Sequence, residues 1–154
     1  NYKYSKKSQE IFNLIRLAEQ ADKKTAILLL CQALETMGEN KKRPQKEINV
    51  LDECINLIDK SDLANQQKEP LKNMLSRAKS ISNKNKCKNL IGKYSLYEYK
   101  QFDKMKIFNE AYRIRGKMTH GEKVDYIDAF RCGRYLKIMV LDILKEWSKD
   151  NTKN

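Results

Sequence analysis

One segment limits the possible folds of this chain more than any other. Residues 23–38, which contain TAILLLCQALETM, place apolar side chains on nearly every face of a helix. Such a helix needs other elements to cover it on several sides, as in the middle of a helical bundle. We therefore expect this helix to be central. Its one acidic residue, Glu35, should lie near buried surface and need a polar partner.

The rest of the pattern predicts an all-α bundle of about five to six helices, the last of them long. Only 5 glycines and 2 prolines occur in 154 residues, which disfavours a sandwich or barrel with its many turns. Apolar residues recur at helical spacing in five further segments. These segments are 5–21, 44–58, 62–81, 101–119 and 123–148.

Several finer expectations concern individual segments. Pro70 falls inside the pattern of 62–81 and predicts a break or kink there. Residues 82–93 are basic and polar and indicate a loop or a frayed end, whereas the segment with Tyr94, Tyr97 and Tyr99 is left unassigned. The pattern has neither a repeat nor a linker, so it favours one domain over 1–154. The buried side of the last helix is expected to carry Ile127, Leu136, Met139, Val140, Ile143, Leu144 and Trp147.

The charge balance points to a polyanionic partner. The chain has 32 Lys and Arg against 20 Asp and Glu, a net charge of +12. Such an excess attracts nucleic acid, although a generally basic proteome would also account for it. The longest apolar run, 26–31, is too short to span a bilayer, and we expect no signal peptide. We expect a cytoplasmic protein with RNA as its partner and no membrane contact. Because the chain begins at Asn1 and not at methionine, a fragment of a larger protein is a further expectation.

The cysteine and histidine content argues against a metal site. None of the cysteines forms a CxxC pair, and the chain has a single histidine. We therefore expect no metal and no cofactor. Most of the cysteines lie in apolar helical patterns, which predicts buried free thiols in a reducing compartment. They are Cys31, Cys54, Cys87 and Cys132.

The stretch AYRIRGKMTHGE, residues 111–122, carries the candidate functional groups. Arg115 lies at the edge of an apolar stripe and should be half-buried, with a guanidinium that needs an anion. His120 is expected at the end of the same helix, where exposed carbonyls favour the imidazolium, and Gly121 is a typical helix terminator. Positions five apart on a helix diverge by about 140°, so convergence on one ligand requires a distorted last turn. Gly116 and Gly121 would permit one.

Structural roles are an alternative for each of these residues. His120 can be a helix-terminal histidine bonded to a carbonyl. Arg115 can form an ion pair inside the bundle, for example with Glu35, whose own role is then structural. Arg113 and Arg131 can belong to a solvated face or contact an RNA backbone.

The stretch YRIRGKMTHG resembles the HEPN superfamily, and in particular its Apea-like branch. The shared features are an arginine, four residues, a histidine and a glycine near a helix end, followed by a long amphipathic helix. Glu35 in ALETM also resembles a residue of the family's second helix. The resemblance implies a homodimer in which Arg115 and His120 of two copies face each other across a cleft.

Active members of the superfamily cleave RNA without a metal ion, through attack of the ribose 2′-hydroxyl on the adjacent phosphate. His120 would then be the general acid or base, and Arg115 would hold the phosphate. Arg113, Lys117, Glu35 and Arg131 would bind RNA phosphates or support the site.

One departure from the family leaves an alternative open. Gly116 follows Arg115 where catalytic members commonly have Asn, Asp or His. The alternative is a noncatalytic module for dimerisation or for binding nucleotides or RNA, within a larger defence or stress protein. A partner domain or an antitoxin fits either hypothesis. A helical DNA-binding regulator ranks last, because the helices around the glycine turn are too apolar for a helix-turn-helix.

Overall fold

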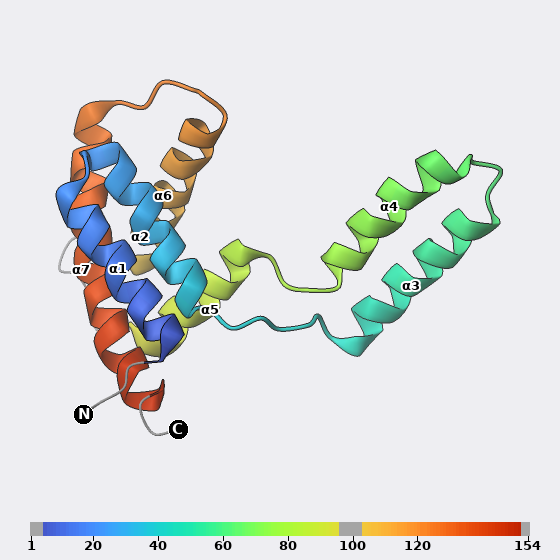
Figure 1. Cartoon of the computed structure of the whole chain (residues 1–154), viewed down its shortest axis with the longest axis horizontal. Helices are drawn as coiled ribbons and strands as arrows, with labels where there is room; N and C mark the ends of the chain where they lie inside the picture. Colours follow the sequence, from blue (N-terminus) through green and yellow to red (C-terminus); the bar gives the residue numbers. More distant parts are fainter. Residues whose placement is uncertain (1–4, 96–102, 152–154) are drawn as a thin grey trace. The chain divides into compact units, whose positions relative to one another are not determined.

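The computed structural model describes residues 5–95 and 103–151, which form seven α-helices and no strand (Figure 1). The expected all-α fold with a long C-terminal helix is confirmed. The unassigned residues Tyr97 and Tyr99 lie outside the described residues. The helices are α1 (Lys6–Gln20), α2 (Lys23–Met37), α3 (Gln45–Lys60), α4 (Asn65–Ala78), α5 (Asn83–Tyr94), α6 (Lys104–Thr119) and α7 (Tyr126–Asn151).

The chain has two compact units. Residues 1–39 and 87–154 form the bundle unit, and residues 40–86 form the hairpin unit. The single domain expected over 1–154 stays a prediction.

Helix α2 is the central helix of the bundle unit, as its sequence predicts. It contacts α1, α6 and α7 (Figure 1). Its start is fixed by Asp22, whose carboxylate accepts hydrogen bonds from the backbone N–H groups of Lys24 (2.9 Å) and Thr25 (3.2 Å). The side chains that it buries are Ile27, Leu30, Cys31, Ala33, Leu34 and Met37.

Helix α7 supplies the longest side of the core, but the expected burial of Ile127 was wrong. Asp125 accepts hydrogen bonds from the N–H groups of Ile127 (2.8 Å) and Asp128 (3.0 Å), so the helix begins at Tyr126. Ile127 is in the first turn and is 65% exposed, whereas the buried face begins at Ala129. The other core residues expected for this helix are buried: Leu136, Met139, Val140, Ile143, Leu144 and Trp147.

The expectation of a loop at 82–93 was wrong, because these residues belong to α5. Four side chains at helical spacing are buried there: Cys87, Leu90, Ile91 and Tyr94. The many Lys and Asn residues occupy the other side of the helix. A narrow apolar stripe is therefore sufficient for a helix when a core covers it.

The hairpin unit consists of α3 packed on α4. Of the break or kink expected at Pro70, the break was wrong, because α4 continues through this residue from Asn65 to Ala78. Proline removes one backbone hydrogen bond and its ring crowds the C=O four residues earlier, and the packing of α4 on α3 offsets this cost. Backbone hydrogen bonds close the base of the hairpin, from Arg43 N–H to Lys79 C=O (2.9 Å) and from Ile81 N–H to Lys41 C=O (3.0 Å).

All four cysteines are free thiols, and Cys31, Cys87 and Cys132 are buried, as expected. Burial raises the pKa of Cys132 to about 12 and also raises that of Cys31. These thiols therefore stay protonated and act as small apolar side chains.

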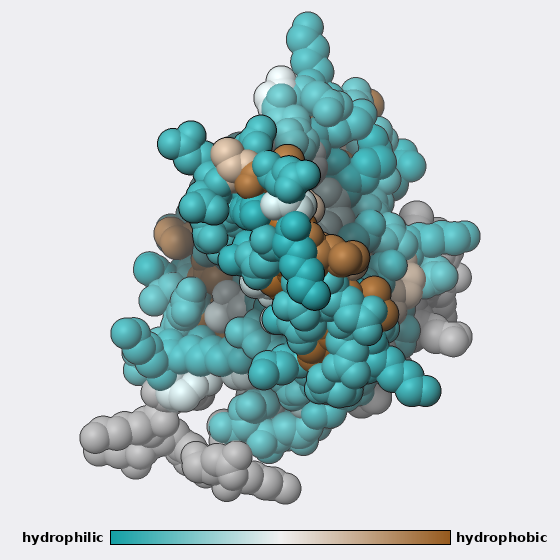
Figure 2. Space-filling model, turned by 90° about the vertical axis from the view of Figure 1, so that its right-hand side faces the viewer, coloured by the Kyte–Doolittle hydropathy of each residue, from teal (hydrophilic) through white to brown (hydrophobic). Residues whose placement is uncertain are grey.

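Among residues 5–95 and 103–151, no helix is long and apolar enough to cross a membrane. The face shown in Figure 2 is mainly hydrophilic, and hydrophobic residues reach it in small groups.

Candidate functional site

The helix end expected at His120 and Gly121 is present, whereas α6 is α-helical through Gly116 to Thr119, so the turn that separates Arg115 from His120 is not unwound. Helix α6 ends at Thr119, and His120 is its C-cap residue. Gly121 follows with φ of +72°, a left-handed conformation that favours glycine. The N–H of Glu122 donates to the C=O of Lys117 (2.8 Å) and the N–H of Gly121 to that of Met118 (3.2 Å). This pair of bonds forms a Schellman motif, which holds His120 through backbone contacts and leaves its side chain exposed.

Arg115 is bound by a carboxylate from another helix. Its Nη2 lies 3.2 Å from Oε1 and 3.3 Å from Oε2 of Glu35 on α2. The Tyr112 hydroxyl donates to the same Oε1, and the Arg115 guanidinium lies 5.1 Å from the Tyr112 ring centroid. The side chains of Glu35 and Arg115 are 14% and 33% exposed. Glu35 therefore has the polar partners that its buried position requires.

This cluster orients the guanidinium without using all of its donors. Burial, together with the hydrogen bond to Glu35, raises the pKa of Tyr112, so its phenol stays a donor. Both contacts to Glu35 use Nη2, whereas a guanidinium has five N–H donors. Arg115 can thus retain Glu35 and bind a phosphate oxygen from its exposed side.

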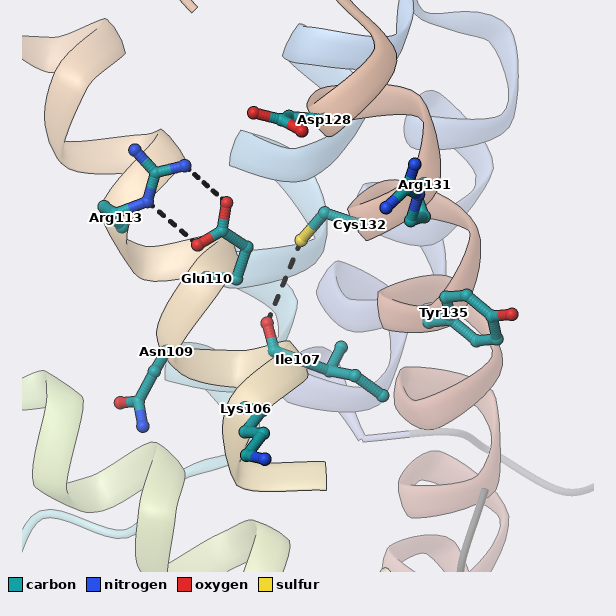
Figure 3. Close-up of a pocket in the computed structure, with 9 residues that line it drawn as sticks. All are labelled: Lys106, Ile107, Asn109, Glu110, Arg113, Asp128, Arg131, Cys132 and Tyr135. Atoms are coloured by element: carbon teal, nitrogen blue, oxygen red, sulfur yellow. Dashed lines mark hydrogen bonds and ion pairs between the residues drawn. The ribbon is translucent and has the colours of Figure 1, made fainter. Parts of the chain in front are cut away.

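A second group of charges lies between α6 and α7, around a cavity of about 520 Å³ (Figure 3). Arg113 is held there by Glu110 through two bonds, Nε–Oε2 at 2.8 Å and Nη2–Oε1 at 2.5 Å. Arg131 of α7 lines the same cavity. The Cys132 thiol donates to the C=O of Ile107 (3.8 Å) and contributes an apolar wall. This volume is in the range of small-molecule sites.

The structure therefore divides the predicted site residues other than His120 into two groups. Arg113 and Arg115 are two positions apart and point about 200° apart around α6, so the groups occupy different sides of this helix. Glu35 joins Arg115, and Arg131 joins Arg113. The hydrogen bonds from Arg113 lower the pKa of Glu110, and the charge of Lys117, two turns further along α6, adds to this effect. Neither Arg115 nor His120 lines the α6–α7 cavity.

Two residues that contact the arginines of the candidate site were missed in the sequence analysis. Tyr112 and Glu110 each precede an arginine of α6 by three residues, a spacing that brings side chains together on a helix. This spacing predicts the Glu110–Arg113 ion pair. The contact of Tyr112 with Glu35 joins residues 77 positions apart, which local spacing does not reveal.

Among the described residues, no group of three or more His, Cys, Asp or Glu side chains is arranged to hold a metal ion.

Comparison of the chain with protein-family models, with curated proteins and with solved structures found no match. The HEPN resemblance stays an expectation based on residues of this chain, above all Arg115 and His120.

The Glu110–Arg113 pair gives a pH-dependent prediction. The hydrogen bonds from Arg113 hold the pKa of Glu110 below its ordinary value of 4.5. The stabilisation is therefore complete above that value and is lost as the pH falls through the lower pKa of the folded protein. Replacing Glu110 with glutamine should reduce the free energy of unfolding at pH 7 by less than about 1 kcal/mol, because the pair is partly exposed.

Urea unfolding at pH 7 and under progressively acidic conditions measures this effect. The difference between the wild type and Glu110→Gln should shrink in acid. Glu10→Gln, at an exposed position on α1, is the control and should change little at either pH. A Glu110→Gln deficit that persists unchanged in strong acid would contradict the assignment.

Proposed function

We propose that the chain binds RNA and, as a homodimer, cleaves it without a metal ion through Arg115 and His120. The observation that supports this function best is the environment of Arg115. Its guanidinium is oriented by Glu35 and Tyr112, remains one-third exposed, and precedes an exposed histidine by five residues on the same helix. A fixed cation and a titratable group are the two components that transfer of an RNA phosphate requires.

The proposed reaction uses only these groups and the RNA. An imidazole removes the proton of the ribose 2′-hydroxyl, and the oxygen attacks the adjacent phosphorus. The bond from phosphorus to the 5′-oxygen breaks, and that oxygen receives a proton from an imidazolium. Two copies of His120 in a dimer supply one group for each proton transfer, while Arg115 offsets the charge on the phosphate. The products have a 2′,3′-cyclic phosphate and a 5′-hydroxyl.

The other cations of α6 and α7 would hold the flanking RNA. Arg113, Arg131 and Lys117 belong to the α6–α7 side, where cations outnumber carboxylates and can contact phosphates. The net charge of +12 favours binding to RNA over its whole surface. A cytoplasmic defence or stress system with a partner domain or an antitoxin is the setting that the resemblance implies.

A noncatalytic RNA- or nucleotide-binding module is the second candidate, and Gly116 is the observation that favours it. Apart from its chain neighbours and the backbone of its own helix, nothing lies within 4 Å of the position of a Cβ at Gly116. The polar residue that catalytic relatives commonly have there would fit, so packing does not require the glycine.

The two candidates differ in what happens to RNA. We expect the purified full chain to cut cellular RNA in the presence of EDTA and to leave 2′,3′-cyclic phosphate ends. A matched RNA oligonucleotide with 2′-O-methyl groups should bind with similar affinity and stay intact, because it lacks the attacking hydroxyl. Binding of both without cleavage would support the noncatalytic module, and no binding to either would reject both candidates.

A further inference from the structure

The hairpin unit leaves large apolar side chains without cover. No residue of α3 or α4 is fully buried, so the two helices by themselves form no closed core. Leu57 is 68% and Met74 is 59% exposed, and Val50, Leu63 and Leu71 are exposed as well. Several large apolar side chains left exposed on one small helical element are typical of a protein–protein interface.

Two ion pairs fix the register of the hairpin. Lys72 Nζ lies 2.8 Å from Asp59, and Lys79 Nζ lies 2.6 Å from Asp52. The two pairs are seven residues apart on each helix and run in opposite directions, so α3 and α4 are antiparallel. Leu57 precedes Asp59 by two residues and Met74 follows Lys72 by two, which places these apolar side chains at the same level.

The exposed apolar residues of both helices lie on one side of the hairpin. The half-buried apolar side chains of α3, which form the stripe toward α4, are Ile48, Leu51, Ile55 and Ile58. Val50 and Leu57 are rotated from the centre of this stripe by about 120–140°. On α4, Met74 is rotated by a similar angle in the same sense from the residues that face α3, and Leu71 lies beside it. Because the helices are antiparallel, these equal rotations lead to the same side of the pair. The result is one apolar face, formed by Val50, Leu57, Leu71 and Met74.

The charges at the borders of this face are complementary to those of a second copy. Glu53 borders the face on α3 and Arg77 borders it on α4, and both are exposed. Glu53 is next to Asp52, and Arg77 is two residues before Lys79. Because Asp52 and Lys79 form an ion pair, Glu53 and Arg77 lie at nearly the same height along the hairpin axis. A two-fold axis parallel to the helices would place α3 of each copy on α4 of the other and bring Glu53 to Arg77 twice.

We propose that the hairpin unit is a dimerisation element, in which the apolar faces of two copies pack into a four-helix bundle. Leu57 of each copy then covers Met74 of the other, and two Glu53–Arg77 pairs border the interface. This inference does not depend on RNA binding or cleavage, since it concerns only the hairpin. A second copy is the occupant that the paired charges favour.

Sedimentation equilibrium of the full chain over a concentration series tests the proposal. The wild type should be a dimer, and the double substitution Leu57→Glu with Met74→Glu should raise the dissociation constant by about 100-fold or more, because it buries charges at the centre of the interface. Ile127→Glu is the matched control. It adds one negative charge, as each of the two hairpin substitutions does, at a similarly exposed apolar residue of α7 and should leave the dimer intact. Circular dichroism verifies the helical content of each variant.

A charge exchange tests the arrangement of the two copies. Glu53→Arg and Arg77→Glu should each weaken the homodimer, because like charges then meet at both borders. A mixture of the two variants should form heterodimers, because each border then joins opposite charges. A wild type that is monomeric throughout the series, or a dimer unaffected by Leu57→Glu with Met74→Glu, would overturn the proposal. Association of the variants that does not improve on mixing would overturn the α3-on-α4 arrangement.

Discussion

Replacement of His120 by alanine is expected to reduce the rate of the proposed RNA cleavage by about 10²- to 10⁴-fold, the usual contribution of a general acid or base. The fold should be unaffected. The backbone N–H of His120 binds the C=O groups of Gly116 (3.1 Å) and Lys117 (3.2 Å), and alanine retains both bonds. The imidazole itself is exposed, so its removal opens no cavity. Single-turnover cleavage of a defined RNA in EDTA gives the rates, and thermal unfolding verifies the fold.

Matched substitutions distinguish catalysis from a loss of charge. Arg115→Ala should also strongly reduce the rate of cleavage, whereas Arg16→Ala removes an arginine from an exposed position on α1 and should change the rate little. Lys123→Ala is the corresponding control for a position just after His120. If His120→Ala and Arg115→Ala cleave as fast as the wild type, the activity belongs to another site or to a contaminant, and the proposed mechanism is wrong.

The parts of the fold that follow from local patterns were predictable. Helix α2 is central because its apolar residues cover nearly every face, and this pattern is visible in the sequence. The burial of Glu35 and its need for a partner follow from its position on that helix. The end of α6 follows from Gly121, whose φ of +72° favours glycine. In each case the determinant lies within a few residues of the feature.

Features that depend on distant residues were not predictable in the same way. Helix α5 has few apolar residues, and only the core that covers Cys87 and Ile91 identifies its four-residue stripe as a buried face. Arg115 and Glu35 are 80 positions apart, so spacing alone left the ion pair as one alternative among several. The exposed face of the hairpin was missed for the opposite reason. Leu71 and Met74 fit a helical stripe, and local periodicity does not show that nothing within the hairpin covers them.

The second large effect is expected from the core beneath the Arg115 cluster. Phe108 is among the largest fully buried side chains, and its ring centroid lies 4.7 Å from that of Tyr112 at an angle of 50°. Replacing Phe108 with alanine should reduce the free energy of unfolding by about 3–5 kcal/mol, since it removes buried apolar surface and leaves a cavity. A domain of this size is typically stable by about 5–15 kcal/mol, so the variant would retain only part of its stability. Urea unfolding measures the change.

Phe12→Ala is the control for this substitution, because Phe12 is a phenylalanine of α1 that is 43% exposed and should lose much less stability. The Phe108 ring also supports Tyr112, which donates to Glu35, and Glu35 in turn positions Arg115. Under conditions where Phe108→Ala is still folded, its cleavage rate should therefore fall as well, although Phe108 does not contact RNA in the proposed site. A loss of stability similar to that of Phe12→Ala would show that the α6 core is packed differently. Full cleavage by folded Phe108→Ala would show that Tyr112 and Glu35 do not need this ring to hold Arg115 in place.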